Sequence, residues 1–463
     1  MTRRTALQTL AALPAINLLA QQTRPDSFRA YTDGPRLLLR PARLKLLRRE
    51  RERRSLRWDQ FETLWGGNAP FPELGFVQAL RYQIADDKDA GVRAVAWAVG
   101  PADDVRQIAI IADWCDELVK GSDRQQIFVK LQKAMNDPKP LKTLEDARTR
   151  VFAAVVLSDA QPAASEKALQ SVFDGFWMGS FIPGLRRGQS AVSNADAYAL
   201  LELMHAFRDN LNFDLRETFP AWFRQYPVQH VMAHYPTPFP GAENEYRIPA
   251  DAAIEKTGPD VRKATLSRAA EMAMVAFDTN ESASQLLQGW VMNDRFLMRG
   301  PLGIPYEFLW ANPYQPGLSY YHIALALHDE IGGQLFVRSS WEDDAQWVGF
   351  FGGQLQLFRD GEITTVDPKK SREPLDIDAA VILFARETRT FQTPETKPAD
   401  KDADGKEEDL NVFIVGLEPK HAFHVEVDGE GMVEYSSDPG GIVYLAGVQP
   451  GAGVRLGFAP PLS

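Results

Sequence analysis

Hydrophobic residues recur at intervals of three and four over the first two thirds of the chain, which predicts a succession of amphipathic helices. The pattern begins at Pro41, a residue favoured in the first turn of a helix, and continues to about residue 277. After the segment that opens at Pro41, the predicted helices are 74–84, 90–99, 103–119, 125–135, 144–157, 166–177, 195–207, 261–277 and 283–291. Short connections that often contain Pro or Gly separate them, as antiparallel helix pairs require. About ten such helices predict a toroid or a solenoid of paired helices.

The helical pattern weakens between Phe213 and Pro259, where proline, aromatic, histidine and amide residues are dense. Long irregular segments inside a compact domain are usually functional or disordered. So many aromatic residues argue against disorder. We therefore expect this segment to form a loop that contributes to a binding cleft.

After about Ile331 the period changes to two, which is typical of β-strands. In FHVEVD (423–428) apolar and polar side chains alternate strictly, as in a half-buried antiparallel strand. The charged, Pro-containing stretch 393–409 predicts a mobile loop between strands. The pattern thus predicts an α+β chain of two domains, helical over 21–330 and an antiparallel β-sandwich over 331–463.

The net charge of the chain restricts the classes of molecule that it is expected to bind. It carries 51 Lys and Arg against 62 Asp and Glu, a formal net charge of −11. This balance argues against nucleic acid as the main partner, because a phosphate-binding surface needs excess positive charge. An anionic sugar polymer is still possible, since a local group of arginines can act inside an acidic protein.

The first twenty residues have the layout of a secretory signal. Arg3 and Arg4 precede a weakly apolar stretch over 6–19, and the arginine pair resembles a twin-arginine signal. This predicts export to the periplasm or the cell exterior, although an ordinary amphipathic first helix is the alternative. No later stretch is long and apolar enough to predict a membrane span. The single cysteine, Cys115, excludes an intramolecular disulfide and falls on the apolar face of a predicted helix.

Three stretches together resemble a known family. They are GPRLLLRPARLKLLR, IAIIADWCDELV and GQLFVRSSWEDDAQWVGFFGG, and their order and spacing are similar to those of heparinase II/III-like polysaccharide lyases. The resemblance covers most of the chain. It implies an incomplete (α/α) toroid followed by an antiparallel β-sandwich.

The resemblance also implies a reaction, β-elimination on uronate-containing polysaccharides. The C5 proton of a uronate becomes acidic only when its carboxylate is neutralised, and a base and an acid must then act on either side of the bond. In this chain Asn194 stands at the position of the neutralising Asn, followed by Ala195 where His is common. Tyr246 matches the catalytic Tyr as base and acid, and Arg247 beside it is placed to assist with the carboxylate.

The family's His-x-His strand aligns with GGQLQLFRDGE, so Gln354 and Gln356 stand at the two histidine positions. Side chains two apart in a strand point the same way. Glutamine does not titrate near neutral pH and is a poor transition-metal ligand. The chain is therefore interpreted as a divergent member without a metal or cofactor, in which these glutamines contact substrate.

Further candidates for substrate binding are His234, Glu245, Trp310 and Tyr314. Aromatic residues just before the change from helix to strand either line a cleft, where flat rings suit sugar faces, or pack between domains. Two catalytic candidates also have structural alternatives. Asn194 follows Ser193 in a capping-box-like helix start, and Tyr246 in a Pro-flanked loop can be a packing aromatic.

The resulting hypothesis is an exported carbohydrate-active protein that cleaves or binds an acidic polysaccharide. The main alternative is a non-catalytic glycan-binding or structural protein of the cell envelope on the same scaffold. Hydrolysis by paired acids such as Glu243 and Glu245 is a third possibility, which no sequence feature favours.

Overall fold

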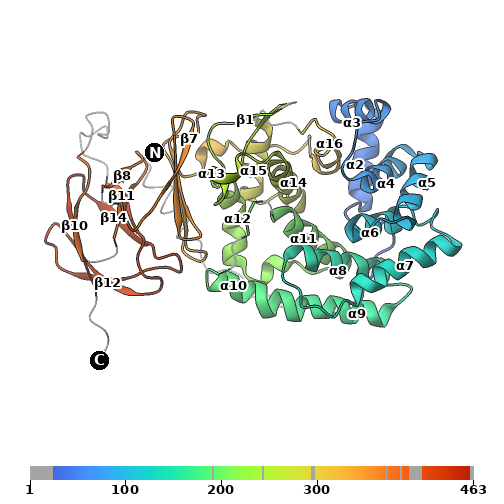
Figure 1. The fold of residues 1–463 in the computed structure, drawn as a ribbon, viewed down its shortest axis with the longest axis horizontal. Helices are drawn as coiled ribbons and strands as arrows, with labels where there is room; N and C mark the ends of the chain where they lie inside the picture. Colours follow the sequence, from blue (N-terminus) through green and yellow to red (C-terminus); the bar gives the residue numbers. More distant parts are fainter. Residues whose placement is uncertain are drawn as a thin grey trace.

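The chain forms a helical part followed by a β part, which lie side by side (Figure 1). The computed structural model describes residues 24–189, 192–194, 196–241, 244–293, 298–371, 373–385, 388–395 and 409–458. The predicted signal 1–20 and most of the predicted loop 393–409 lie outside these residues. Within the described residues, no helix is both long enough and apolar enough to cross a membrane.

The helical part contains these elements. They are α2 (Pro41–Glu52), α3 (Leu56–Gly66), α4 (Leu74–Ala85), α5 (Lys88–Val99), α6 (Val105–Trp114), α7 (Gly121–Met135), α8 (Leu144–Val156), α9 (Pro162–Ser171), the π-helix η1 (Val172–Phe181), α10 (Ile182–Arg186), α11 (Ala197–Leu211), η2 (Leu215–Thr218), α12 (Pro220–Met232), α13 (Ile254–Thr257), α14 (Val261–Phe277), α15 (Ser282–Asn293), α16 (Ile304–Trp310) and η3 (Tyr320–His322). A short hairpin of β1 (Phe239–Pro240) and β2 (Glu245–Tyr246) follows α12.

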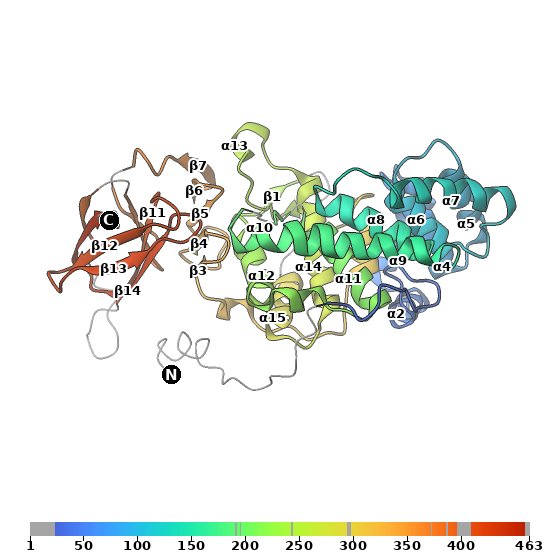
Figure 2. The same cartoon turned by 90° about the horizontal axis from the view of Figure 1, so that it is seen from below.

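The helices form two layers around an arc (Figures 1 and 2). In one layer α4, α6, α8, α11 and α14 contact one another in sequence, and α16, α3 and α2 continue the contacts back to α4. The helices α5, α7, α9 and α15 pack against this layer. Sequence features set where helices begin: Asp87, Asp104 and Thr143 accept backbone N–H groups at the starts of α5, α6 and α8. The predicted toroid-like helical domain is confirmed.

A buried ionic group joins three helices of the arc. Glu202 of α11 accepts hydrogen bonds from Arg106 of α6 and Arg148 of α8, and Arg106 also pairs with Glu73 at 3.0 Å. Burial alone raises the pKa of the Glu202 carboxyl, but the two guanidinium groups outweigh it and lower that pKa. The ionised group therefore fixes the mutual positions of these helices.

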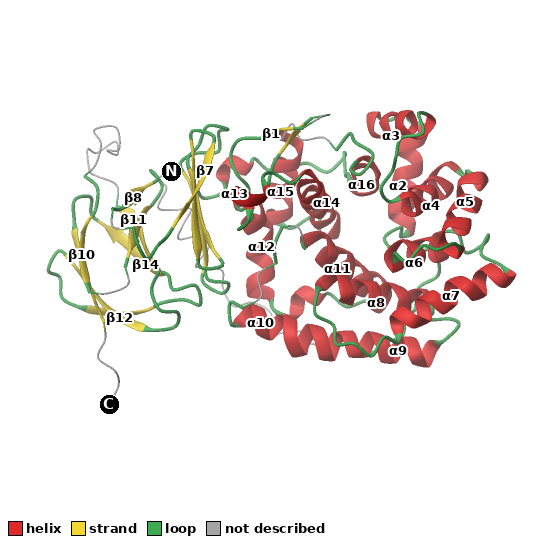
Figure 3. Cartoon of the chain, viewed as in Figure 1, coloured by secondary structure: helices red, strands yellow, loops and turns green. Residues whose placement is uncertain are grey.

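The β part consists of three sheets in layers (Figure 3). The first sheet contains, in spatial order, β3 (Ala326–Asp329), β4 (Gln334–Arg338), β5 (Trp347–Phe351), β6 (Gln354–Arg359) and β7 (Glu362–Val366). The second contains β14 (Val443–Val448), β11 (Leu410–Val415), β9 (Val381–Phe384) and β8 (Leu375–Asp376). The third contains β10 (Arg389–Gln392), β15 (Gly453–Phe458), β12 (Ala422–Val427) and β13 (Val433–Ser436). All pairs are antiparallel except β9 with β11.

The middle sheet is buried on both faces. Ile382 and Phe413 belong to a core shared with Leu335 of the first sheet, whereas Leu383 packs with Phe423 of the third. This burial explains the continuous apolar run of β9, because strands covered on both faces lose the polar alternation. The predicted sandwich is confirmed, and a third layer is added to it.

The outer face of the first sheet packs against α12 and the segment after it. Trp347 Nε1 donates to the carbonyl of Met232 at 2.9 Å, and Gln229 Nε2 donates to Gln334 at 2.9 Å. The prediction of an irregular segment from Phe213 to Pro259 is wrong for its first half, because α12 and η2 are regular helices. The described part of the second half contains the β1–β2 hairpin and the short helix α13, and its Tyr235 and Asp251 contact the first sheet.

Candidate functional site

Aromatic and cationic residues gather where the helical part meets the first sheet. Arg247 follows β2, Trp290 lies on α15, Tyr320 in η3, Arg338 ends β4, and Trp341 follows it; we call these five the junction cluster. The Cζ atom of Arg247 lies 5.4 Å from the Trp290 ring centre and that of Arg338 4.6 Å from the Trp341 ring centre. Tyr320 lies 5.3 and 5.4 Å from the two tryptophan rings. Two cations and three flat rings thus share one place.

Arg338 is a buried cation without an acidic partner. Its exposed fraction is 1%, and among the described residues no carboxylate lies within 4.0 Å of its guanidinium. Its Nη1 donates to the carbonyl of His234 at 3.4 Å, while its Nε has no partner within the described chain. Burial, and then the charge of Arg247, lower the pKa of Arg338 to about 9. The buried guanidinium of Arg338 therefore has a hydrogen-bond donor that lacks an acceptor within the described chain.

One neighbouring group adds a second unmet donor. Trp290 Nε1 is buried and finds no hydrogen-bond partner in the described residues. Arg247 Nη2 pairs at 2.7 Å with Oδ1 of Asp343, whose side chain is 60% exposed. Two buried donors of the junction cluster, Arg338 Nε and Trp290 Nε1, therefore have no acceptor among the described residues. Such a region is complementary to a ligand rich in oxygen and negative charge.

A second polar group lies next to it. His230 lies in the last turn of α12 and His234 two residues beyond its end. Both direct their Nε2 atoms at Ser267 and Glu271, which lie one turn apart on α14. These four residues form what we call the histidine cluster. The Nε2 atoms lie 3.0 and 3.1 Å from Ser267 Oγ, and each is 3.5 Å from Glu271 Oε1. All four side chains are buried.

The charge states in the histidine cluster follow from its surroundings. Burial alone raises the pKa of Glu271, but Arg268, at 2.8 Å, and the histidines outweigh it and hold that pKa at about 2. Burial lowers the pKa of His234 to about 3, despite the opposing effect of Glu271. Near neutral pH the cluster therefore holds a carboxylate and a neutral His234.

Comparisons with known proteins do not identify a family for this chain. No family model matches the chain, and no curated protein matches it either. One solved structure, described as a glycoside hydrolase, is similar to this chain at 9% identity and a TM-score of 0.29. The similar region covers 84% of this chain and 72% of that one. A likeness at this level says nothing about activity.

Asn194 lies beside the histidine cluster, and its amide group is already engaged. Its Nδ2 donates to the carbonyls of His230 and Ala233, at 3.3 Å each, and lies 3.5 Å from His234 Nδ1. Both N–H groups thus face the last turn of α12. In this arrangement the side chain holds the end of a helix, and only its oxygen is left for other contacts.

Tyr246 is buried on β2, opposite Phe239. Its ring lies against Gly241, where a Cβ atom would approach the ring to 2.0 Å, so that position needs glycine. The strand β2 contacts α14, which carries Ser267 and Glu271. Glu245, the preceding residue, is exposed.

The three predicted catalytic residues border one region through their neighbours. Asn194 contacts His234, and the His234 ring lies 6.1 Å from the Trp290 ring. The guanidinium of Arg247 lies over that same Trp290 ring. Tyr246 adjoins Arg247 in the chain. Their catalytic roles stay predictions, because these contacts show position and not chemistry.

Trp310 and Tyr314 lie within the helical part. Trp310 is buried on α16, where its Nε1 donates to Tyr198 at 3.0 Å and its ring stacks near His205. Tyr314 is half exposed and donates to Glu50 of α2 at 2.7 Å. Of the aromatic residues predicted near the domain change, Tyr320 reaches the junction cluster. The substrate contacts of Trp310 and Tyr314 stay predictions.

Gln354 and Gln356 point to the same side of β6 but differ in surroundings. Gln354 is exposed, whereas Gln356 is fully buried at the junction. Gln356 accepts from the Tyr235 hydroxyl at 2.7 Å and donates to the carbonyl of Asp251 at 2.8 Å. Gln356 therefore fastens the sheet to the segment after α12.

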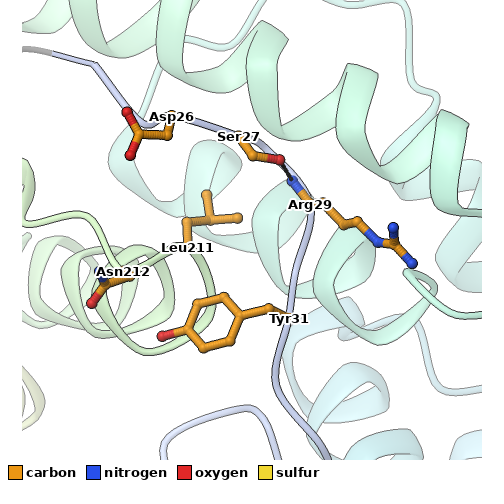
Figure 4. A pocket seen from close by; sticks show the side chains of 6 residues that line it. All are labelled: Asp26, Ser27, Arg29, Tyr31, Leu211 and Asn212. Atoms are coloured by element: carbon orange, nitrogen blue, oxygen red, sulfur yellow. Dashed lines mark hydrogen bonds between the residues drawn. The ribbon is translucent and has the colours of Figure 1, made fainter.

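A pocket of about 250 Å³ lies elsewhere, between the first described residues and the end of α11 (Figure 4). It is lined by Asp26, Ser27, Arg29, Tyr31, Leu211 and Asn212. None of the predicted site residues belongs to it. Its lining shows no convergence of titratable groups, so the junction remains the better candidate.

The sequence contained signals for the residues that we did not single out. Arg338 ends an otherwise apolar strand, QLFVR, where a charged residue needs a reason to be buried. His230 and His234 stand four apart, a spacing that would bring both to one face of a helix, although α12 ends at Met232 and His234 follows it. The segment was not predicted as a helix, so this spacing was not recognised.

Proposed function

We propose that this chain recognises an acidic, uronate-containing polysaccharide at the junction cluster, and that β-elimination is its reaction. The observation that carries the proposal is the buried guanidinium of Arg338, which stands beside Arg247 and has no carboxylate within 4.0 Å among the described residues. A sugar carboxylate supplies the missing charge and acceptors. Trp290 and Trp341 supply flat faces of the kind that sugar rings cover.

The division of roles follows from the positions and charges of these side chains. Arg338 and Arg247 neutralise the uronate carboxylate, which makes the C5 proton removable. Tyr246, next to Arg247, acts as base and acid in the manner implied by the family resemblance. Asn194 keeps a supporting role, since its amide N–H groups are donated to α12.

A specific observation favours the alternative of binding without cleavage. Tyr246 is buried, with an exposed fraction of 7%, and the histidine positions of the family's strand hold Gln354 and Gln356. A protein that kept the scaffold and lost the chemistry would keep the arginines and the tryptophans. Both functions require an acidic glycan at the same place.

One experiment tests both. The purified chain is incubated with alginate, heparan sulfate, chondroitin sulfate and hyaluronan, and ultraviolet absorbance is followed, because β-elimination creates an unsaturated uronate that absorbs. Binding to the same polymers is measured in parallel. Carboxyl-reduced polymers serve as matched controls, because they keep the sugar rings and any sulfate groups and lose the carboxylate charge.

We expect binding to at least one native polymer, weakened by salt and lost with its carboxyl-reduced form. Arg338→Met should reduce this affinity at least tenfold, about 1.4 kcal/mol, whereas Arg359→Met, at an exposed residue that ends β6 of the same sheet, should not. Arg338→Met should leave the fold intact, because the arginine has no ion pair to break. Absorbance that Tyr246→Phe abolishes supports the lyase; binding without absorbance supports the binder. Equal binding of native and reduced polymers contradicts both.

A further inference from the structure

The histidine cluster has a geometry that its internal hydrogen bonds do not explain fully. Two imidazoles face one hydroxyl, at 3.0 and 3.1 Å from Ser267 Oγ. A hydroxyl has one proton, so it donates to one imidazole and must accept from the other. Glu271 Oε1 lies 3.5 Å from both Nε2 atoms, beyond the range of a good hydrogen bond.

We propose that His230, His234 and Glu271 bind a divalent transition-metal ion, with zinc as the best fit. In a tetrahedral zinc site with bonds of about 2.0–2.1 Å, neighbouring donor atoms stand about 3.3–3.4 Å apart. The carboxylate oxygen of Glu271 lies 3.5 Å from each Nε2 atom, which is close to this donor-to-donor separation. The three donor atoms all lie within 4.8 Å of one another. Ser267 Oγ lies 3.0 and 3.1 Å from the two Nε2 atoms.

The outer contacts suit this role. His234 Nδ1 lies 2.9 Å from the carbonyl of His230, so Nδ1 carries the proton and Nε2 turns its lone pair inward. Arg268 meets Glu271 at Oε2, which leaves Oε1 toward the histidines. Within the described chain His230 Nδ1 has no hydrogen-bond partner. The surroundings of this atom therefore do not determine which nitrogen of the His230 ring carries the proton.

Charge determines the kind of ion and the fourth ligand. Two imidazoles and one carboxylate are ligands for zinc-like ions, whereas calcium and magnesium prefer oxygen alone. Because Arg268 already balances Glu271, the ion brings excess positive charge into a buried place. An anionic fourth ligand, such as hydroxide, offsets part of this charge. This site is on the helices and is separate from the strand positions of Gln354 and Gln356.

The test measures metal directly and requires no activity. The full chain, with any affinity tag removed, is stripped with a chelator, dialysed against Zn²⁺ or Co²⁺, and analysed by mass spectrometry of metals. Four-coordinate Co²⁺ gives strong visible absorption bands. His234→Gln and Glu271→Gln are compared with His424→Gln, a control on β12 whose side chain is 35% exposed. Circular dichroism reports whether each variant folds.

We expect one ion per chain, visible cobalt bands and a melting temperature raised by at least about 3 °C with Zn²⁺. Metal content should fall at least tenfold in both cluster variants and stay unchanged in the control. Metal far below one ion per chain, or cobalt bands absent from the wild type, would overturn the proposal even if the variants do not fold. Equal metal content in folded cluster variants would overturn it as well.

Discussion

His205 shows how a single residue responds to a dry, cationic environment. It lies on α11 between the rings of Trp310 and Phe277, at centroid distances of 4.7 and 5.0 Å. The Arg208 guanidinium donates to Nδ1 at 3.0 Å, so Nε2 carries the proton and donates to the carbonyl of Ala273 at 3.1 Å. Burial, and then the charge of Arg208, lower the pKa of His205 well below its ordinary value.

This environment predicts a pH dependence of stability. The folded protein keeps His205 neutral, whereas the unfolded chain protonates it below about pH 6.5. Because the unfolded state then binds more protons, the free energy of unfolding falls with pH below that value, by up to about 1.4 kcal/mol per pH unit. His205→Gln removes this contribution and keeps a donor for Ala273.

Urea unfolding from about pH 7.5 to 5 measures the effect. We expect the variant to be less stable at the upper end, and the difference from the wild type to shrink as the pH falls. A difference that does not vary with pH contradicts the assignment. Comparison of the two proteins cancels the opposite contribution of Asp113, whose pKa burial raises to about 6.

At the scale of elements, α12 shows where periodicity was insufficient. The helix carries aromatic residues on several faces and Pro227 in its interior, so its apolar positions form no single stripe. Tertiary contacts hold it: Trp222 stacks on Tyr226 at 4.5 Å, and Trp347 donates to its last carbonyl. Helices with one apolar stripe, such as α6 and α11, were predictable. A helix buried between two domains was not.

The C-terminal end of α12 gives a prediction about Asn194. Asn194→Ala removes two hydrogen bonds, to the carbonyls of His230 and Ala233, although each carbonyl keeps another donor, His234 Nδ1 and the Ala250 N–H respectively. We expect a loss of about 1–3 kcal/mol in the free energy of unfolding. Asn136→Ala, an exposed residue after α7, should change it by less than about 0.5 kcal/mol.

Urea unfolding of both variants provides the measurement. Asn194→Asp should be at least as harmful as alanine, because a carboxylate would face two carbonyl oxygens. The predicted catalytic role leads to a different result. If Asn194→Ala keeps the wild-type stability but loses binding to acidic glycans, the amide is a ligand group and not a helix cap.

At the scale of the whole molecule, the order of helices before strands was readable from the change in period, but the layering was not. The runs AAVILFA and NVFIVGL were predicted as strands. This prediction did not indicate that β9 and β11 form a middle sheet between two others. Which strands share a sheet depends on contacts between distant residues, and no local pattern records them.

The same limit applies to the site. The spacing of Gln354 and Gln356 correctly placed both side chains on one face of a strand, since that follows from strand geometry. The helical part covers Gln356 and leaves Gln354 exposed, and that difference arises only when the two parts dock. Arg338 is likewise buried by the packing of the helical part on the first sheet.

The docking predicts cooperative unfolding of the two parts. Gln356 joins Tyr235 and Asp251 to the first sheet, and Gln225 donates to Asp329 at 2.7 Å. Because these bonds are buried, neither part should lose its structure alone. Gln356→Ala breaks two bonds and leaves a cavity, which should cost about 2–4 kcal/mol, whereas Gln354→Ala should cost almost nothing. Scanning calorimetry should therefore show one endotherm in the wild type, shifted as a whole in Gln356→Ala. Two endotherms, of which the variant moves only one, would mean that the helical and β parts are stable independently.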